Sequence, residues 1–110
     1  MTDIQELTMA ISQFNKDRDW DQFHNGKDLS IALSIEASEL LESFLWKNPE
    51  EVKLEKVSEE LADVFCYALQ IADKYNLDVK EIVMRKLAKN AEKYPVEKAR
   101  GVATKYNEFD

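Results

Sequence analysis

Two short segments of the sequence repeat one arrangement of acidic residues. Glu36-Ala-Ser-Glu39 and Glu60-Leu-Ala-Asp63 each place two carboxylates three residues apart, followed by two apolar residues. In a helix, residues three apart share a face, with Cβ atoms about 5–6 Å apart. Two such helices packed antiparallel would let carboxylates from both sides reach shared Mg²⁺ ions. We therefore predict a metal centre with catalytic function, formed by Glu36, Glu39, Glu60 and Asp63.

The charges around these acids favour a metal over ion pairs. Residues 29–45 contain three glutamates and no basic residue. Two carboxylates about 6 Å apart repel by roughly 3 kcal/mol at an effective dielectric near 20, whereas a helical ion pair returns about 0.3–0.5 kcal/mol. Lys56 offers an ion pair to Glu60 alone. The competing interpretation is that all four acids are ordinary solvated residues on amphipathic helices.

Residue counts disfavour two other kinds of metal site. A ferritin-like di-iron bundle needs two Glu-x-x-His motifs, and zinc prefers His and Cys ligands. The sequence contains one His and one Cys. Because the remaining ligands are carboxylate oxygens, we expect Mg²⁺, with Mn²⁺ as a substitute.

The composition predicts a single all-α domain over residues 1–110. A chain of this length holds one core. An apolar fraction of 45% with two Gly and two Pro fits long helices joined by short connections.

The acidic charge argues against nucleic acid as a partner. Residues 1–79 hold 7 Lys/Arg against 17 Asp/Glu, and residues 80–110 hold 8 against 5, which leaves −10 and +3. Duplex binding depends on basic residues that neutralise phosphates. A small polyanion could still bind through metal ions.

No membrane segment or leader is expected. The charge-free stretches 29–35 and 64–72 are far shorter than the roughly 20 apolar residues that span a bilayer. The first residues include Asp3 and Glu6 rather than a basic region, and the single Cys66 excludes an internal disulfide. We therefore expect a cytoplasmic protein.

Four long helices are predicted from caps and apolar spacing. The first is capped by Thr2 and runs to about residue 16, and residues 17–28 form a loop with a turn at 25–26. The second is capped by Asp28 and runs to about residue 45. The third begins at Asn48-Pro49 and continues, with a bend, to residue 75. The fourth has a capping box of Asp78 and Glu81 and stops at residue 95, and the tail from 96 to 110 is extended or wrapped on a neighbour.

The two acidic motifs, separated by 20 residues, resemble the signature of the MazG-like all-α nucleotide pyrophosphohydrolases. Four stretches are similar to the dCTP pyrophosphatase branch of that family. They are RDWDQFH at 18–24, ELLESFLWK at 39–47, EELADV at 59–64 and KYP at 93–95. The similarity covers nearly the whole chain.

This resemblance implies a four-helix MazG-like bundle completed by oligomerisation, as a homodimer or a tetramer built from two dimers. It implies Mg²⁺-dependent hydrolysis of a deoxynucleoside triphosphate to monophosphate and pyrophosphate, as house-cleaning of the nucleotide pool. A dCTP-like substrate is expected first, with dATP or modified dNTPs as further candidates. The animal dCTP enzymes carry a His where this chain has Ile11, which leaves the cytosine preference open.

The resemblance also assigns residues to the substrate. Those expected around the base and sugar are Trp20, Phe23, His24, Trp46 and Tyr67, for which the alternative is core packing. Candidate phosphate contacts are Lys86, Asn90, Lys93 and Lys105, for which the alternative is a solvated basic face. Glu39 is the candidate general base.

Three alternatives compete with this function. A related all-α family hydrolyses phosphoribosyl-ATP, although Trp20 and Trp46 favour a nucleobase pocket over that substrate. A non-catalytic nucleotide-binding regulatory module and a purely structural helical oligomer are the others. The four carboxylates oppose both, because without catalysis nothing favours so much uncompensated repulsion.

Overall fold

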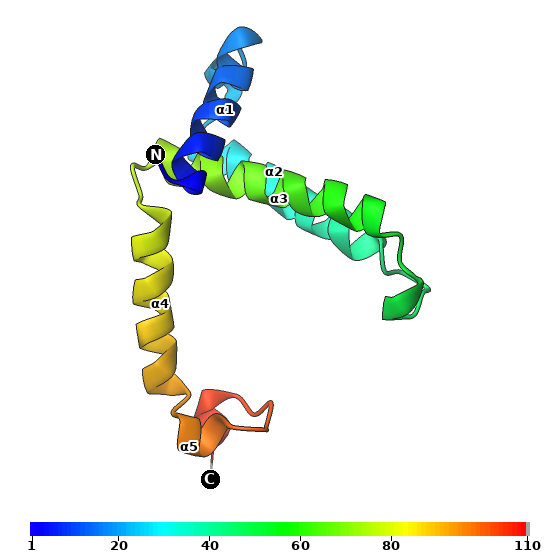
Figure 1. Ribbon diagram of the computed structural model, residues 1–110, viewed down its shortest axis with the longest axis vertical. Coiled ribbons are helices and arrows are strands. Elements are labelled where there is room, and N and C mark those ends of the chain that lie inside the picture. Colours follow the sequence, from blue (N-terminus) through cyan, green and yellow to red (C-terminus); the bar gives the residue numbers. More distant parts are fainter. Residues whose placement is uncertain (110) are drawn as a thin grey trace. The chain divides into compact units, whose positions relative to one another are not determined.

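The computed structural model describes residues 1–109, which form helices and turns without a strand. The helices are α1 (Asp3–Asp17), α2 (Gly26–Glu42), α3 (Leu54–Lys74), α4 (Val79–Lys93) and α5 (Val96–Ala99), with the 3₁₀ helices η1 (Asp21–Phe23), η2 (Pro49–Glu51) and η3 (Tyr106–Glu108). The chain divides into two compact units, Met1–Leu77 and the part from Asp78 onward (Figure 1). The predicted all-α class is confirmed. Among these helices, none is long and apolar enough to cross a membrane.

Helix α1 begins at the predicted capping box. The Gln5 backbone N–H donates to the Thr2 hydroxyl at 3.2 Å, and the Thr2 N–H donates to the Gln5 side chain at 2.9 Å. Together these bonds satisfy two N–H groups that a helix start otherwise leaves without partners. The helix ends at Asp17, close to the predicted residue 16.

Helix α2 begins earlier than predicted, and Asp28 is not its cap. The N-cap is Asn25, whose side chain accepts a hydrogen bond from the Asp28 backbone N–H at 2.8 Å. Gly26 is the first helical residue, and a Cβ there would lie 1.8 Å from the Tyr75 hydroxyl oxygen. The pair Asn25-Gly26 therefore starts a helix against the end of α3, where the sequence predicted a turn. The helix ends at Glu42, so the predicted end at residue 45 is too late.

The predicted third helix is interrupted after its first turn. Pro49 opens η2, and Val52 and Lys53 then adopt extended backbone before α3 begins at Leu54. The Asn48 side chain makes no capping bond to the backbone and donates instead to the Glu51 carboxylate at 2.9 Å. The predicted end is confirmed, since Tyr75 is the C-cap of α3.

Helices α2 and α3 lie side by side and form the main packing of the first unit (Figure 1). The buried apolar side chains are Leu29, Leu69 and Ala72, which lie where α2 begins and α3 ends. Helix α1 packs on α3. At the other end of the pair, Leu41 and Leu54 stay exposed. The hydrophobic core is therefore small and lies at one end of the helix pair.

The second unit consists of α4 and the segment that follows it. Asp78 caps α4 by accepting from the Glu81 N–H at 2.9 Å, but the Glu81 side chain pairs with Arg85, so only half of the predicted capping box forms. The tail is folded rather than extended. Its aromatic rings Tyr106 and Phe109 pack edge-on against Tyr94, with centroids 5.9 and 5.8 Å away.

Candidate metal and nucleotide site

Carboxylates from α2 and α3 meet between the two helices. One oxygen each from Glu36, Glu60 and Asp63 lies within 4.8 Å of the other two. Glu36 and Glu60 are half-buried, and Asp63 is exposed. The three-residue spacing puts Glu60 and Asp63 on one face of α3, and the packing of α2 brings Glu36 opposite them. We call these three residues the carboxylate cluster.

Mutual repulsion and burial act strongly on this cluster. The pKa of Glu36 is raised from 4.5 to about 7. Burial is the largest cause, followed by the side chain of Glu39 and then by the charges of Asp63 and Glu60. Burial and Glu39 also raise the pKa of Glu60, whereas Lys56, the weakest influence, lowers it. Because Glu39 acts on both residues, it lies beside the cluster. All four predicted acids are thus neighbours within one chain.

The cluster has the properties of a cation site. The Oε2 atoms of Glu36 and Glu60 are buried and receive no hydrogen bond from residues 1–109. In the same part of the chain, the one ion pair within 4.0 Å joins Arg85 and Glu81, so no basic side chain forms an ion pair with the cluster. Buried charges are normally paired or bound to metal. A donor set made only of oxygens suits a hard divalent cation such as Mg²⁺ or Mn²⁺.

Tyr67, which the resemblance assigns to the substrate, lies close to the cluster, and its contact with substrate stays a prediction. Burial raises the pKa of its hydroxyl, and the charges of Glu36 and Asp63 raise it further. Burial and the charge of Asp63 likewise raise the pKa of Cys66. The Tyr67 hydroxyl therefore stays neutral beside the acids and can donate a hydrogen bond to a phosphate oxygen.

The structure separates the two predicted tryptophans. Trp20 precedes α2 and packs edge-on against Phe14, with centroids 5.7 Å apart, and it is 44% exposed. Trp46 follows α2, is 99% exposed and has a positive φ of 63°. The 17 residues of α2 separate them by about 25 Å along the helix axis. One chain therefore cannot place both tryptophans around one base.

The other residues predicted around the base lie before α2. Phe23 ends η1 and is 62% exposed. His24 is half-buried, and its Nδ1 is buried without a hydrogen-bond partner among residues 1–109. They share the Trp20 end of α2.

The predicted phosphate contacts lie in the second unit. Lys86, Asn90 and Lys93 follow one face of α4 because they are spaced by four and three residues. The Lys93 ammonium lies 4.9 Å from the centroid of the Tyr106 ring, which brings it near the segment of Lys105. The structure thus groups these residues, and their contact with phosphate stays a prediction.

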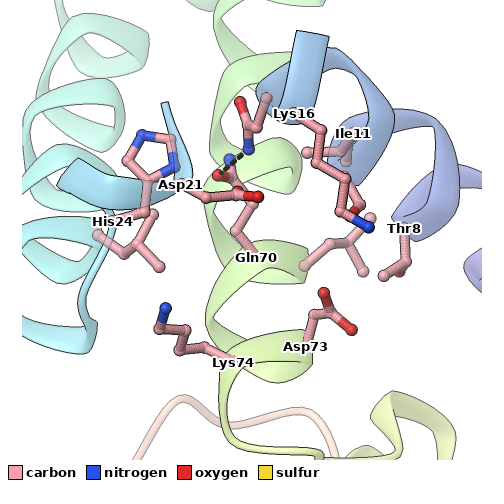
Figure 2. A pocket seen from close by; sticks show the side chains of 12 residues that line it. Thr8, Ile11, Lys16, Asp21, His24, Gln70, Asp73 and Lys74 are labelled. Atoms are coloured by element: carbon pink, nitrogen blue, oxygen red, sulfur yellow. Dashed lines mark hydrogen bonds between the residues drawn. The ribbon is translucent and has the colours of Figure 1, made fainter. Parts of the chain in front are cut away.

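A cavity of about 380 Å³ was not predicted from the sequence. It is bounded by α1, η1, the start of α2 and the end of α3 (Figure 2). His24 and Ile11 line it, together with an amide pair formed by the buried Asn15 and the half-buried Gln70. Figure 2 shows Lys74 and Asp73 on α3 below Gln70, and Lys16 on α1. The available signal was Asn15 itself, a polar residue four positions after Ile11 on the apolar side of the first helix.

The fold and site together define an all-helical protein with an acidic cluster suited to a divalent cation. Residues 31–109 match the MazG-like family. The sequence is 33% identical to dCTP pyrophosphatase 1 of Mus musculus, over 96% of this chain and 67% of that protein, and 32% identical to the Homo sapiens protein over the same shares. A solved structure of a pyrophosphatase from Archaeoglobus fulgidus matches with a TM-score of 0.81 and 36% identity, over 86% of this chain and 94% of that one.

The chain belongs to the MazG-like family. The predicted family is therefore confirmed, and so is the predicted enzyme class, a nucleoside triphosphate pyrophosphatase.

Proposed function

We propose that this protein hydrolyses a deoxynucleoside triphosphate to the monophosphate and pyrophosphate, with Mg²⁺ as cofactor and dCTP as the first candidate substrate. The carboxylate cluster carries the proposal, because its two buried Oε2 atoms have no donors in the described chain. The relatives named dCTP pyrophosphatase 1 support dCTP. House-cleaning of the nucleotide pool in the cytoplasm is the role that we propose for this activity.

Glu36, Glu60 and Asp63 would hold the metal, with Glu39 beside them. When bound, Mg²⁺ supplies positive charge against the phosphates and lowers the pKa of water. Glu36 and Glu60 are half-buried, which limits the access of bulk water. The attraction between a bound metal ion and a triphosphate is therefore stronger there than at an exposed surface. The acidic residues thus provide a cation-dependent phosphate site.

The reaction needs a proton acceptor and an aligned α-phosphorus. A water oxygen attacks the α-phosphorus while the bond from that phosphorus to the bridging oxygen breaks, and pyrophosphate leaves with that oxygen. We assign the water proton to Glu39, which is half-buried and lies beside both Glu36 and Glu60. We assign the neutral Tyr67 hydroxyl, which lies near Glu36 and Asp63, to a phosphate oxygen.

We assign the nucleoside to the cavity, whose lining residues on α2 and α3 lie about two helical turns from the cluster. Leu29 precedes Glu36 by seven residues on α2, and Gln70 follows Asp63 by seven on α3. Seven residues are nearly two helical turns, so each pair shares a helix face about 10 Å apart. A nucleotide with its phosphates at the cluster can therefore extend its base into the cavity.

We propose a homo-oligomer, either a dimer or a dimer of dimers, because one chain leaves its apolar surface and its base site incomplete. Ile35 on α2 and Phe65 on α3 are 52% and 58% exposed. Trp46 holds a left-handed backbone conformation while its side chain is almost fully in water, although that conformation is costly for a residue with a Cβ. A second copy that buries Trp46 at the cavity end of the first would bring both tryptophans to one base.

Product analysis tests the proposed function. The purified protein is incubated with each dNTP and ribonucleotide, with Mg²⁺ or with EDTA, and the products are separated by chromatography. We expect monophosphate and pyrophosphate in equal amounts with Mg²⁺ and none with EDTA. Release of orthophosphate, or turnover that is unaffected by EDTA, would contradict the proposal. Nucleotide binding without any turnover would favour the regulatory module instead.

A further inference from the structure

The amide side chains of Asn15 on α1 and Gln70 on α3 meet at the wall of the cavity. Asn15 is 6% exposed, which is unusual for a polar residue on a helix whose other side chains are mostly open to solvent. The Asn15 Nδ2 donates to the Gln70 Oε1 at 2.8 Å. Both residues line the cavity. They place one hydrogen-bonded amide pair in a wall that also contains the apolar side chains Leu29 and Leu69.

A chain of hydrogen bonds fixes which way each amide points. Gln70 Nε2 donates to the Cys66 carbonyl at 3.1 Å, and a carbonyl oxygen can only accept. The Gln70 Oε1 must therefore face Asn15, and the Asn15 Nδ2 must be the donor to it. If the Asn15 amide turned over, its oxygen would face Gln70 Oε1, and two acceptors would oppose each other.

This arrangement leaves Asn15 with an unused acceptor. Its Oδ1 receives no hydrogen bond from residues 1–109, yet it is not among their fully buried polar atoms without a partner. The atom therefore stays open to a ligand or to water, and Asn15 lines the cavity. A base in the cavity therefore faces the Asn15 Oδ1 as an acceptor. The Asn15 amide cannot turn over to present its Nδ2 instead without losing its hydrogen bond to Gln70.

We propose that Asn15 is a specificity-determining residue whose Oδ1 accepts a hydrogen bond from the amino group of the base, with Gln70 as the residue that positions it. The inference rests on the proposed function and deepens it. Cytosine carries an amino donor at the position where uracil carries a carbonyl oxygen. That oxygen would face the Asn15 Oδ1 as a second acceptor, so the site favours dCTP over dUTP.

The ratio of kcat/KM for dCTP to kcat/KM for dUTP tests this assignment. We expect the ratio to fall about tenfold or more in Asn15→Leu, because the variant loses the acceptor that distinguishes the bases. In Gln70→Leu the ratio should fall as well, since Asn15 can then turn its Nδ2 toward uracil. Gln13→Leu is the matched control, because Gln13 is an exposed amide on the same helix, and it should leave the ratio unchanged.

Each single variant leaves the remaining amide without its hydrogen-bond partner, which can destabilise the fold. The double variant Asn15→Leu/Gln70→Leu removes both amides and so avoids this loss. Far-UV circular dichroism shows whether each variant is folded. An unchanged ratio in folded variants would overturn the inference and leave the proposed function intact. A wild type that prefers dUTP would overturn both the inference and the choice of dCTP as substrate, and would leave only the hydrolysis to monophosphate and pyrophosphate. A wild type that hydrolyses no triphosphate would overturn both the inference and the proposed function.

Discussion

At the residue level, the carboxylate cluster combines three features that ordinary surface acids lack together. Glu36 and Glu60 each bury an oxygen without a donor in the described chain, a third carboxylate lies within 4.8 Å, and no basic side chain pairs with them. Each feature favours protonation, which the raised pKa values of Glu36 and Glu60 express. A divalent cation relieves all three at once. This distinguishes the cluster from solvated acids on amphipathic helices.

Glu60→Gln should lower kcat/KM by more than about 100-fold, because the amide removes a ligand charge from the metal centre. The fold should be retained, since the change also removes repulsion from Glu39 and Asp63. Glu59→Gln is the matched control, because Glu59 is the adjacent acid and is exposed. Steady-state turnover with Mg²⁺ measures both variants. Retained activity in Glu60→Gln would show that the cluster is not the metal centre.

The metal-free protein should lose stability as the pH rises from about 4.5 to 7. Folded Glu36 keeps its proton to about pH 7, whereas in the unfolded chain it ionises near 4.5, so the folded state binds more protons in this window. After allowance for solvent screening, the loss is about 1 kcal/mol. Urea unfolding in EDTA between pH 4.5 and 8 measures it.

Two changes should remove this dependence. Glu36→Gln abolishes the titration, and saturating Mg²⁺ offsets it because the metal binds the ionised carboxylate. An equally steep loss in Glu36→Gln would assign the effect to another group.

The sequence predicted the carboxylates and missed the amide pair for one physical reason. Glu60 and Asp63 are three residues apart, so helical spacing alone places them on one face. Asn15 and Gln70 are 55 residues apart, and only the packing of α1 on α3 brings them together. Local periodicity carries no information about that crossing.

At the level of elements, the start of α2 depends on Asn25. Its side chain accepts from the Asp28 N–H at 2.8 Å and also donates to the Asp28 carboxylate at 2.9 Å. We expect Asn25→Ala to lower the free energy of unfolding by about 1 kcal/mol, the usual effect of losing such a cap. Urea unfolding followed by circular dichroism measures it.

Asp28→Ala is the comparison, because it removes the side-chain bond and keeps the capping bond. Its effect should be smaller than that of Asn25→Ala. The reverse order would restore Asp28 as the residue that starts the helix.

Helix boundaries were predicted where the local signal was unambiguous. Thr2 and Gln5 form their capping box, and Pro95 follows α4 closely. The errors arose where two signals competed. Asn25-Gly26 is typical of a turn, yet Asn25 caps α2 and Gly26 is its first residue. Asn48-Pro49 is typical of a helix start, yet the helical turn that it opens ends at Glu51.

At the level of the whole molecule, the small core is the main argument for assembly. In the described part of the chain, the buried apolar side chains are Leu29, Leu69 and Ala72. Trp46, at the far end of α2, is 99% exposed. Burying apolar surface contributes about 25 cal/mol per Å². A second copy that covers the exposed apolar side chains, Trp46 among them, would therefore add substantial stability. The exposed fractions could not be predicted from apolar periodicity, which identifies a face and not what covers it.

Phe65→Lys should weaken assembly and activity together. Phe65 is 58% exposed on α3 and lies one turn beyond Leu61, which is 40% exposed, so both belong to the surface that we assign to a second copy. A charge buried without a partner at an interface is strongly unfavourable. We expect the wild type to sediment at twice the 12.8 kDa chain mass or more, and the variant to shift toward a single chain.

Gln13→Lys adds the same charge at an exposed polar position of α1 and should change neither mass nor turnover. Sedimentation velocity and Mg²⁺-dependent hydrolysis, measured on the same samples, decide between two outcomes. Joint loss of mass and activity in Phe65→Lys, with helicity retained, means that the base site needs a residue from a second chain, for which Trp46 is the candidate. A wild type that sediments as a single chain and is fully active would instead mean that one chain completes its own site, and the exposed Trp46 would then have no part in binding the base.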